Sequence, residues 1–237
     1  MVEFIFSEFG VKRRNGGGDH LDKLDRLEPS LTSIKRYFPD AIFTVYSDFD
    51  LKMAGVTLKK VVSPLDTNHP RFGYRSSDLF KFVGLMESKA DLAIAMDSDM
   101  FIVSENVSYI RPITQRFGFC APMNPRVLVK TDSIIGMDGS SIIDESGGYG
   151  FAINTTPLSF YTKNSRARKY LEACVNIMHL SPARAPLIMW QAMWESGFTP
   201  YLLPPQWCVC ETQESIGDEI ILHVGHRRII DYYKIKL

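Results

Sequence analysis

The chain has 237 residues, of which 45% are hydrophobic, enough for one large core, so we expect a single domain over residues 1–237. Lysine plus arginine number 27, as do aspartate plus glutamate, and this balance excludes a broad basic surface for nucleic acid or an anionic membrane. Any anionic ligand therefore has to be held by a local group of residues.

The N-terminus and the cysteines indicate the compartment. Glu3 and the short apolar stretch around it argue against a signal peptide, and no run of residues has the length of a membrane span. The four cysteines form neither a Cys-x-x-Cys pair nor a zinc spacing, so we expect reduced thiols and a cytoplasmic protein. They are Cys120, Cys174, Cys208 and Cys210. A catalytic domain cut from a longer or membrane-anchored chain would give the same pattern.

The first half of the chain alternates between strand and helix patterns. Apolar residues recur every three or four positions over 21–38, which predicts an amphipathic helix, and Pro29 predicts a kink or break in it. A second helix is expected over 78–88. Short apolar runs predict strands over 2–7, 41–47, 58–62 and 92–96, with a glycine-rich, basic loop over 10–20.

This order of elements predicts an α/β fold with a mostly parallel central sheet flanked by helices. Ligands of such sheets bind beyond the carboxyl ends of the strands. The second half is less regular, and Thr156-Pro157 is interpreted there as the start of a helix. Its other patterns predict strands over 117–123, 149–154 and 220–224, and helices over 165–178 and 187–196.

Two Asp-x-Asp motifs occur, and about one is expected by chance at this aspartate content. Asp97-Ser98-Asp99 directly follows the buried strand over 92–96, so both carboxylates can turn towards one cation at the end of that strand. Carboxylate oxygens suit Mg²⁺ or Mn²⁺, which keep open positions for phosphate oxygens. Asp48-Phe49-Asp50 has no such strand and long helix before it and is interpreted as a solvated turn.

Several segments resemble the GT-A fold nucleotide-sugar glycosyltransferases, in the right order along most of the chain. The helix, strand and acidic pair from Arg75 to Val103 resemble the stretch that leads into their Asp-x-Asp. The glycogenin-like, retaining members are the most similar. Their later motifs are matched by Gly147–Asn154, Met189-Trp190-Gln191, Leu203–Trp207 and His223-Val224-Gly225-His226-Arg227. Trp190 stands where those members have an aspartate, the His-to-Gly spacing is shorter, and arginines replace a lysine, which marks a divergent branch.

The resemblance implies a metal-dependent transferase with a nucleotide-binding half over 1–103 and an acceptor-binding half over 104–237. It implies a UDP-sugar donor, a hydroxyl acceptor on a glycan, lipid or protein, and Mn²⁺ or Mg²⁺ held by Asp97, Asp99 and His223, with His226 as the other candidate histidine. Gln191 and Asp99 are the implied catalytic residues, and Gly148, Gly150 and Trp190 the sugar and acceptor residues. The implied donor-binding residues are Phe6, Ser7, Phe9, Gly10, Tyr46, Arg75, Lys81, Asp97, Ser98, Gly225 and Arg227.

Other interpretations of the same residues stay open. His223 can be a core histidine, Arg227 and Arg228 a solvated tail, and the three tryptophans core residues rather than a sugar platform. An inverting enzyme would need a carboxylate base, for which Asp144, Glu145 and Glu195 are candidates. The alternative functions are a Mg²⁺-dependent aspartate-nucleophile phosphatase, a sugar-phosphate nucleotidylyltransferase, and a non-catalytic sugar- or nucleotide-binding module.

Overall fold

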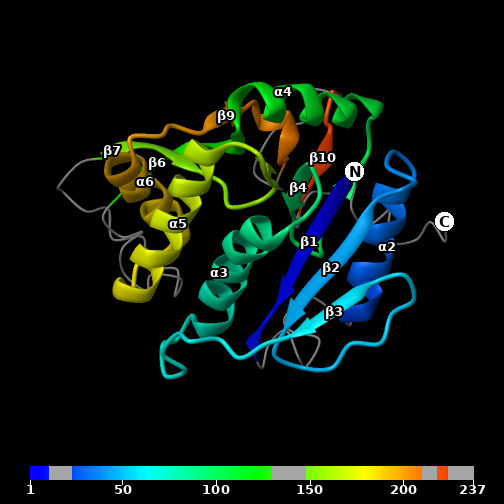
Figure 1. Cartoon of the computed structure of the whole chain (residues 1–237), viewed down its shortest axis with the longest axis horizontal. Helices are drawn as coiled ribbons and strands as arrows, with labels where there is room; N and C mark the ends of the chain where they lie inside the picture. Colours follow the sequence, from blue (N-terminus) through cyan, green and yellow to red (C-terminus); the bar gives the residue numbers. More distant parts are fainter. Residues whose placement is uncertain (11–22, 130–147, 210–217, 224–237) are drawn as a thin grey trace.

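The computed structural model describes residues 1–10, 23–129, 148–209 and 218–223, and it forms one α/β domain (Figure 1). Two short 3₁₀ helices, η1 (Glu105–Tyr109) and η3 (Pro205–Trp207), precede α4 and follow β9. The strands are β1 (Val2–Glu8), β2 (Ile42–Ser47), β3 (Thr57–Lys60), β4 (Leu92–Ala95), β5 (Phe101–Ile102), β6 (Phe119–Val129), β7 (Gly148–Ile153), β8 (Leu158–Tyr161), β9 (Tyr201–Leu203) and β10 (Ile221–Leu222). The α-helices are α2 (Lys23–Lys35), α3 (Phe72–Glu87), α4 (Ile110–Phe117), α5 (Ser165–Leu180) and α6 (Ala185–Ser196).

The main sheet is mostly parallel and has eight strands, with the order β3-β2-β1-β4-β8-β6-β7 and β9 paired with β6. Strands β3, β2, β1 and β4 run parallel, and only β8 and β7 run against the rest. The sheet thus joins the two halves of the chain. The predicted mostly parallel α/β sheet is confirmed.

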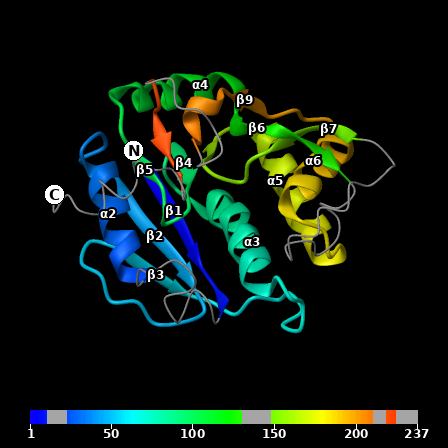
Figure 2. The same ribbon diagram turned by 180° about the vertical axis from the view of Figure 1, so that it is seen from behind.

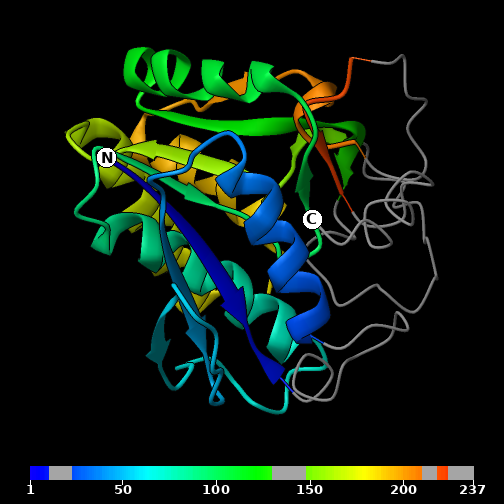
Figure 3. The same cartoon turned by 90° about the vertical axis from the view of Figure 1, so that its right-hand side faces the viewer.

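Helices cover both faces of this sheet because its central strands are apolar on both sides. In β1, Phe4 and Phe6 pack on the face of α2 and α4, whereas Ile5 packs on the face of α3, α5 and α6. Figure 2 shows α2 beside β1 and β2, with α5 and α6 at the opposite side of the molecule. From the side, α4 crosses the end of the sheet near the N-terminus (Figure 3). Among the described residues, no helix is long and apolar enough to cross a membrane.

The structure corrects two local predictions. The described part of helix α2 continues through Pro29, so the predicted break is wrong, although proline has no amide hydrogen to donate within the helix. Thr156-Pro157 does not begin a helix: its peptide bond is cis and β8 follows it directly. The sequence patterns also missed β5, α4, β8 and β9, and α3 begins six residues before its predicted start at 78.

Helix α3 packs closely on the sheet at Gly84. A Cβ atom there would lie 2.6 Å from Cγ2 of Ile5 and 2.9 Å from Cε2 of Tyr46, closer than carbon atoms can approach. Both neighbours are buried and cannot move aside easily.

Gly84→Ala is therefore expected to lower the free energy of unfolding by about 1 to 3 kcal/mol, because overpacking outweighs the better helix propensity of alanine. Urea denaturation measures this change. Glu172→Ala, on the exposed side of α5, is the control and should change stability by less than about 0.5 kcal/mol. Equal stability of Gly84→Ala and the wild type would show that α3 can shift away from the sheet.

Candidate active site

A small antiparallel pairing brings the acidic motif and His223 together. Strand β5 begins two residues after Asp99, and it pairs with β10, which ends at Leu222. In this register Leu222 lies opposite Phe101 and Ile221 opposite Ile102. The residue that follows Leu222 therefore lies beside the residues that precede Phe101, and this places His223 next to Asp99.

Asp97, Asp99 and His223 form a candidate metal site. Their ligand atoms all lie within 4.8 Å of one another, and Nε2 of His223 is 3.7 Å from Oδ2 of Asp97 and 3.5 Å from Oδ1 of Asp99. Two carboxylates and one imidazole are a donor set that suits a divalent cation such as Mn²⁺ or Mg²⁺. The side chain of His223 is 18% exposed, so it lies at the edge of the core rather than fully inside it.

Lys81 adds a cation beside this site. Its Nζ lies 2.7 Å from Oδ1 of Asp97 and 3.2 Å from Oδ1 of Asp78, and it donates a hydrogen bond to the Thr155 carbonyl. Burial alone would lower the pKa of Lys81, but the charges of Asp97 and Asp78 outweigh it and raise the pKa above 10.5. For the carboxyl group of Asp78 burial has the opposite effect: it raises the pKa, and the positive charge of Lys81 only partly offsets this.

The loop that carries the two aspartates is fixed by hydrogen bonds from outside it. The Asp97 amide donates to Oγ1 of Thr156 over 3.0 Å. From helix α2, the Ser30 hydroxyl donates to the Met100 carbonyl, and Ser33 Oγ accepts from the Ile102 amide. Sequence reasoning missed Asp78, Thr156 and these serines; for Asp78 the available signal was its position one helical turn before Lys81.

Arg75 is engaged elsewhere in this structure. Its guanidinium donates to the carbonyls of Met178, Ser181 and Ala183, at and beyond the C-terminal end of α5. Burial lowers the pKa of this side chain. The contacts show Arg75 holding α3 to α5, and its assignment to the donor stays a prediction.

The predicted donor residues of the first strand lie at its carboxyl end, mostly turned into the protein. Phe6 is buried on the α2 face, the Ser7 hydroxyl donates to the Ser77 carbonyl over 2.8 Å, and Phe9 stacks on Phe80. Gly10 has φ of 83° and touches the backbone of α3, which only glycine permits at this distance.

The end of β2 is held in the same way. The Tyr46 hydroxyl donates to Glu87 over 2.7 Å and accepts from Lys59 over 2.8 Å, and burial raises the pKa of Tyr46.

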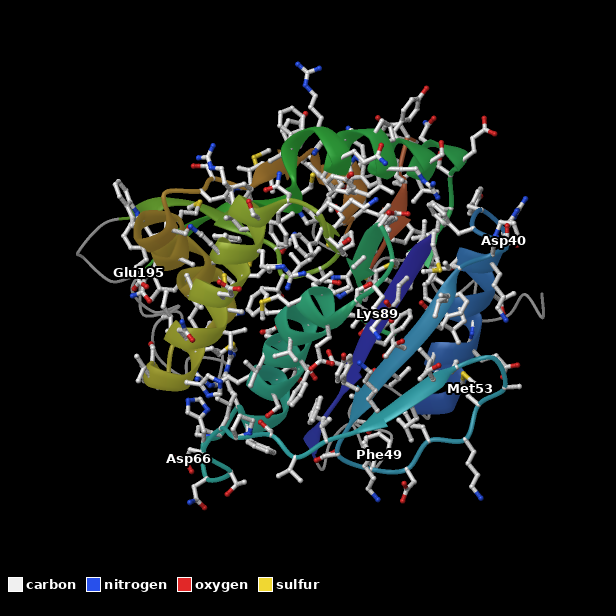
Figure 4. The ribbon with its side chains drawn as sticks, viewed as in Figure 1. Asp40, Phe49, Met53, Asp66, Lys89 and Glu195 are labelled. Atoms are coloured by element: carbon white, nitrogen blue, oxygen red, sulfur yellow. The ribbon has the colours of Figure 1, made fainter. Side chains whose placement is uncertain are left out.

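The two aspartates of the second Asp-x-Asp motif differ in their contacts. Asp48 accepts from the Gly10 amide over 3.3 Å, whereas Asp50 forms an exposed ion pair with Lys60. The interpretation as a solvated turn thus describes Asp50 and not the half-buried Asp48. Figure 4 shows the neighbouring Phe49 on the loop after β2.

The predicted acceptor residues come from β7 and α6. Gly148 and Gly150 lie on β7 opposite Val129 and Leu128, and Trp190 and Gln191 are partly exposed on α6.

The other two tryptophans differ in their surroundings. Trp194 is 74% exposed beside Trp190, whereas Trp207 is buried in the core. Glu195 is exposed at the outer side of α6 (Figure 4).

The remaining candidates lie outside the described residues: Asp144, Glu145, Gly225, His226, Arg227 and Arg228.

Neither a protein-family model nor a curated protein sequence matches this chain. Solved structures do. An active-site mutant of LgtC in which glutamate replaces a glutamine gives a TM-score of 0.56 at 9% identity, over 98% of this chain and 95% of that chain. The galactosyltransferase LgtC with donor and acceptor sugar analogues gives 0.53 at 10% identity over the same shares. The glycosyltransferase GlyE of Streptococcus pneumoniae TIGR4 gives 0.59 at 11% identity, over 98% of this chain and 60% of that chain.

These matches define the fold. The chain is an α/β protein whose sheet and flanking helices have the arrangement found in glycosyltransferases. The fold is GT-A, as the sequence resemblance predicts.

Lys81→Met is expected to lower the free energy of unfolding by about 3 kcal/mol near pH 7, because it leaves Asp78 and Asp97 without their buried cation. The raised pKa of Lys81 keeps its contribution fully present below 10.5, and the contribution is lost only as the pH rises through the folded-state value. Burial raises the pKa of Asp78, so towards pH 4 this carboxylate takes up a proton in the variant and the loss becomes smaller.

Urea denaturation at both pH values measures this difference. Lys163→Met, which removes an exposed ion pair with Asp91, is the matched control and should have little effect at either pH. A loss for Lys81→Met that does not change between the two pH values would contradict the buried ion pair.

Proposed function

We propose that this protein is a metal-dependent glycosyltransferase that moves a sugar from a nucleotide-diphosphate sugar to an acceptor hydroxyl. The resemblance to the GT-A glycosyltransferases favours a UDP-sugar as the donor. The observation that carries the proposal is the cluster of Asp97, Asp99 and His223 on a GT-A fold. The two aspartates of one motif and His223, from a distant part of the chain, converge at one point. LgtC, which has the same fold, is described in complex with donor and acceptor sugar analogues.

In this proposal Asp97, Asp99 and His223 hold Mn²⁺ or Mg²⁺. Such an ion, when bound, neutralises the negative charge that develops on a departing nucleoside diphosphate. Lys81 shares Asp97 with the cation site, so its ammonium fixes the orientation of that carboxylate and adds positive charge on the same side. Ser98, which is 3% exposed, separates the two aspartates, and its backbone lies near the donor in this proposal.

The two halves of the chain have separate roles in this proposal. Residues 1–103 bind the nucleoside through the ends of β1 and β2, and residues 104–237 bind the sugar and acceptor through Gly148, Gly150 and Trp190. Gln191 lies near the anomeric carbon and supports retention of configuration. A glutamine is also the residue replaced in the LgtC active-site mutant.

The alternatives have less support. The matched structures named above are glycosyltransferases, whereas an aspartate-nucleophile phosphatase carries its acidic motif after the first strand rather than after β4. A nucleotidylyltransferase would need a glycine-rich signature with a spacing that residues 10–20 lack. A non-catalytic binding module remains the competing interpretation, and turnover decides between the two.

Asp99→Ala is expected to lower metal-dependent nucleotide release by at least about 100-fold, because it removes a ligand of the cation site. Release of UDP from UDP-sugars with Mn²⁺ measures this, after a thermal-shift screen of UDP, GDP, CMP and their sugars, with and without Mn²⁺, has identified the donor. Asp50→Ala, in the second Asp-x-Asp motif, is the matched control and should retain full activity.

Two outcomes would contradict the proposal. Unchanged metal-dependent binding and turnover in Asp99→Ala would exclude the cation site. A wild-type protein that binds a sugar nucleotide with Mn²⁺ but releases no nucleotide with any acceptor would be a binding module.

Gln191→Ala is expected to reduce the transfer rate by about 10- to 100-fold while the Mn²⁺ and nucleotide affinities stay unchanged, because Gln191 acts near the sugar rather than at the diphosphate. Steady-state kinetics and a thermal-shift titration with UDP separate the two effects. Gln115→Ala on the exposed surface of α4 is the control. Loss of nucleotide affinity in Gln191→Ala would place this residue at the donor instead.

A further inference from the structure

The second ring nitrogen of His223 faces a cysteine. Nε2 is turned towards Asp97 and Asp99, whereas Nδ1 lies 3.7 Å from Sγ of Cys208. Cys208 is 1% exposed and belongs to the core that also contains Met100 and Ile221. The imidazole is therefore bounded by carboxylates on one edge and by a buried sulfur on the other.

The backbone fixes Cys208 beside His223. The Val209 amide donates to the Ile221 carbonyl over 3.0 Å, and the His223 amide donates to the Val209 carbonyl over 2.9 Å. These two bonds form a parallel bridge between Val209 and Leu222. Residues 208 and 223 flank this bridge, so the contact between their side chains is set by the main chain and does not depend on a flexible loop.

The chemistry of imidazole gives this contact a consequence. A neutral imidazole carries a proton on one nitrogen and a lone pair on the other. If Nε2 gives its lone pair to a cation, Nδ1 carries the proton and needs an acceptor. Histidine ligands of metals are generally oriented by such an acceptor, most often a carboxylate or a backbone carbonyl. Here the sulfur of Cys208 takes that place, since sulfur is a weak acceptor within contact distance.

We propose that Cys208 is a positioning residue for the cation site: its sulfur accepts the Nδ1 proton of His223 and holds Nε2 towards Asp97 and Asp99. The inference rests on the cation site of the proposed function and extends it to a residue that does not touch the ion. It also assigns a role to one of the cysteines. The other two described cysteines, Cys120 on β6 and Cys174 on α5, are buried in the hydrophobic core.

Two substitutions separate positioning from packing. Cys208→Val fills a similar volume without an acceptor, whereas Cys208→Ser keeps a hydrogen-bonding oxygen at the same place. We expect Cys208→Val to weaken Mn²⁺ binding about tenfold and Cys208→Ser to stay within about threefold of the wild type. Titration of free Mn²⁺ by electron paramagnetic resonance on the protein alone measures this. Cys174→Val is the control for removal of a buried cysteine and should bind Mn²⁺ like the wild type.

A second measurement reports on the hydrogen bond itself. In the Zn²⁺-loaded protein, the proton on Nδ1 of His223 should give a proton–nitrogen NMR signal that is protected from exchange with water. This signal should be lost in Cys208→Val and retained in Cys208→Ser.

Equal Mn²⁺ affinity of Cys208→Val and the wild type would overturn the inference, and so would equal weakening in the serine and valine variants, which would mean a packing role. These results are separable from failure of the proposed function. If the wild type binds Mn²⁺ with the expected difference between the variants but transfers no sugar, the inference stands and the glycosyltransferase proposal fails. If the wild type does not bind Mn²⁺ at all, both fail.

Discussion

The pairing of β5 with β10 is the interaction on which the candidate site depends. The two aspartates directly follow the carboxyl end of β4, but His223 comes from the far end of the described chain and reaches them through this two-residue ladder, which the bridge between Val209 and Leu222 supports. Helix α2 holds the other side of β5 through Ser30 and Ser33. The elements around the cluster therefore act together to bring three side chains to one point.

The charges around the cluster show why a cation suits it. Asp78, Asp97 and Asp99 are three carboxylates, and among the described residues Lys81 is the lysine that pairs with them. Carboxylates that lie this close repel each other in a partly buried place, and a divalent ion relieves that repulsion.

The sequence predicted the elements with strong local patterns. The apolar strand over 92–96 and the acids that follow it led to the candidate cation site, and the α2 pattern was found despite Pro29. It did not predict β5, β8 or β9, because strands of two to four residues are formed by their pairing partners and have little local pattern of their own. It also missed the role of Asp78, because that role depends on the tertiary contacts around Lys81. Cys208 shows this most clearly, since its contact with His223 arises from a bridge between Val209 and Leu222.

The shortness of β10 has a thermodynamic consequence. A strand pair of two residues opens at a small free-energy cost compared with the eight-stranded sheet, so the histidine edge of the site belongs to the less stable part of the fold. If Asp97, Asp99 and His223 hold an ion as proposed, its binding would stabilise the closed ladder by mass action, by about 2.7 kcal/mol at a hundredfold excess over its dissociation constant. Ion binding and closing of the ladder would then be one coupled equilibrium, and the ion concentration would set how often the ladder opens.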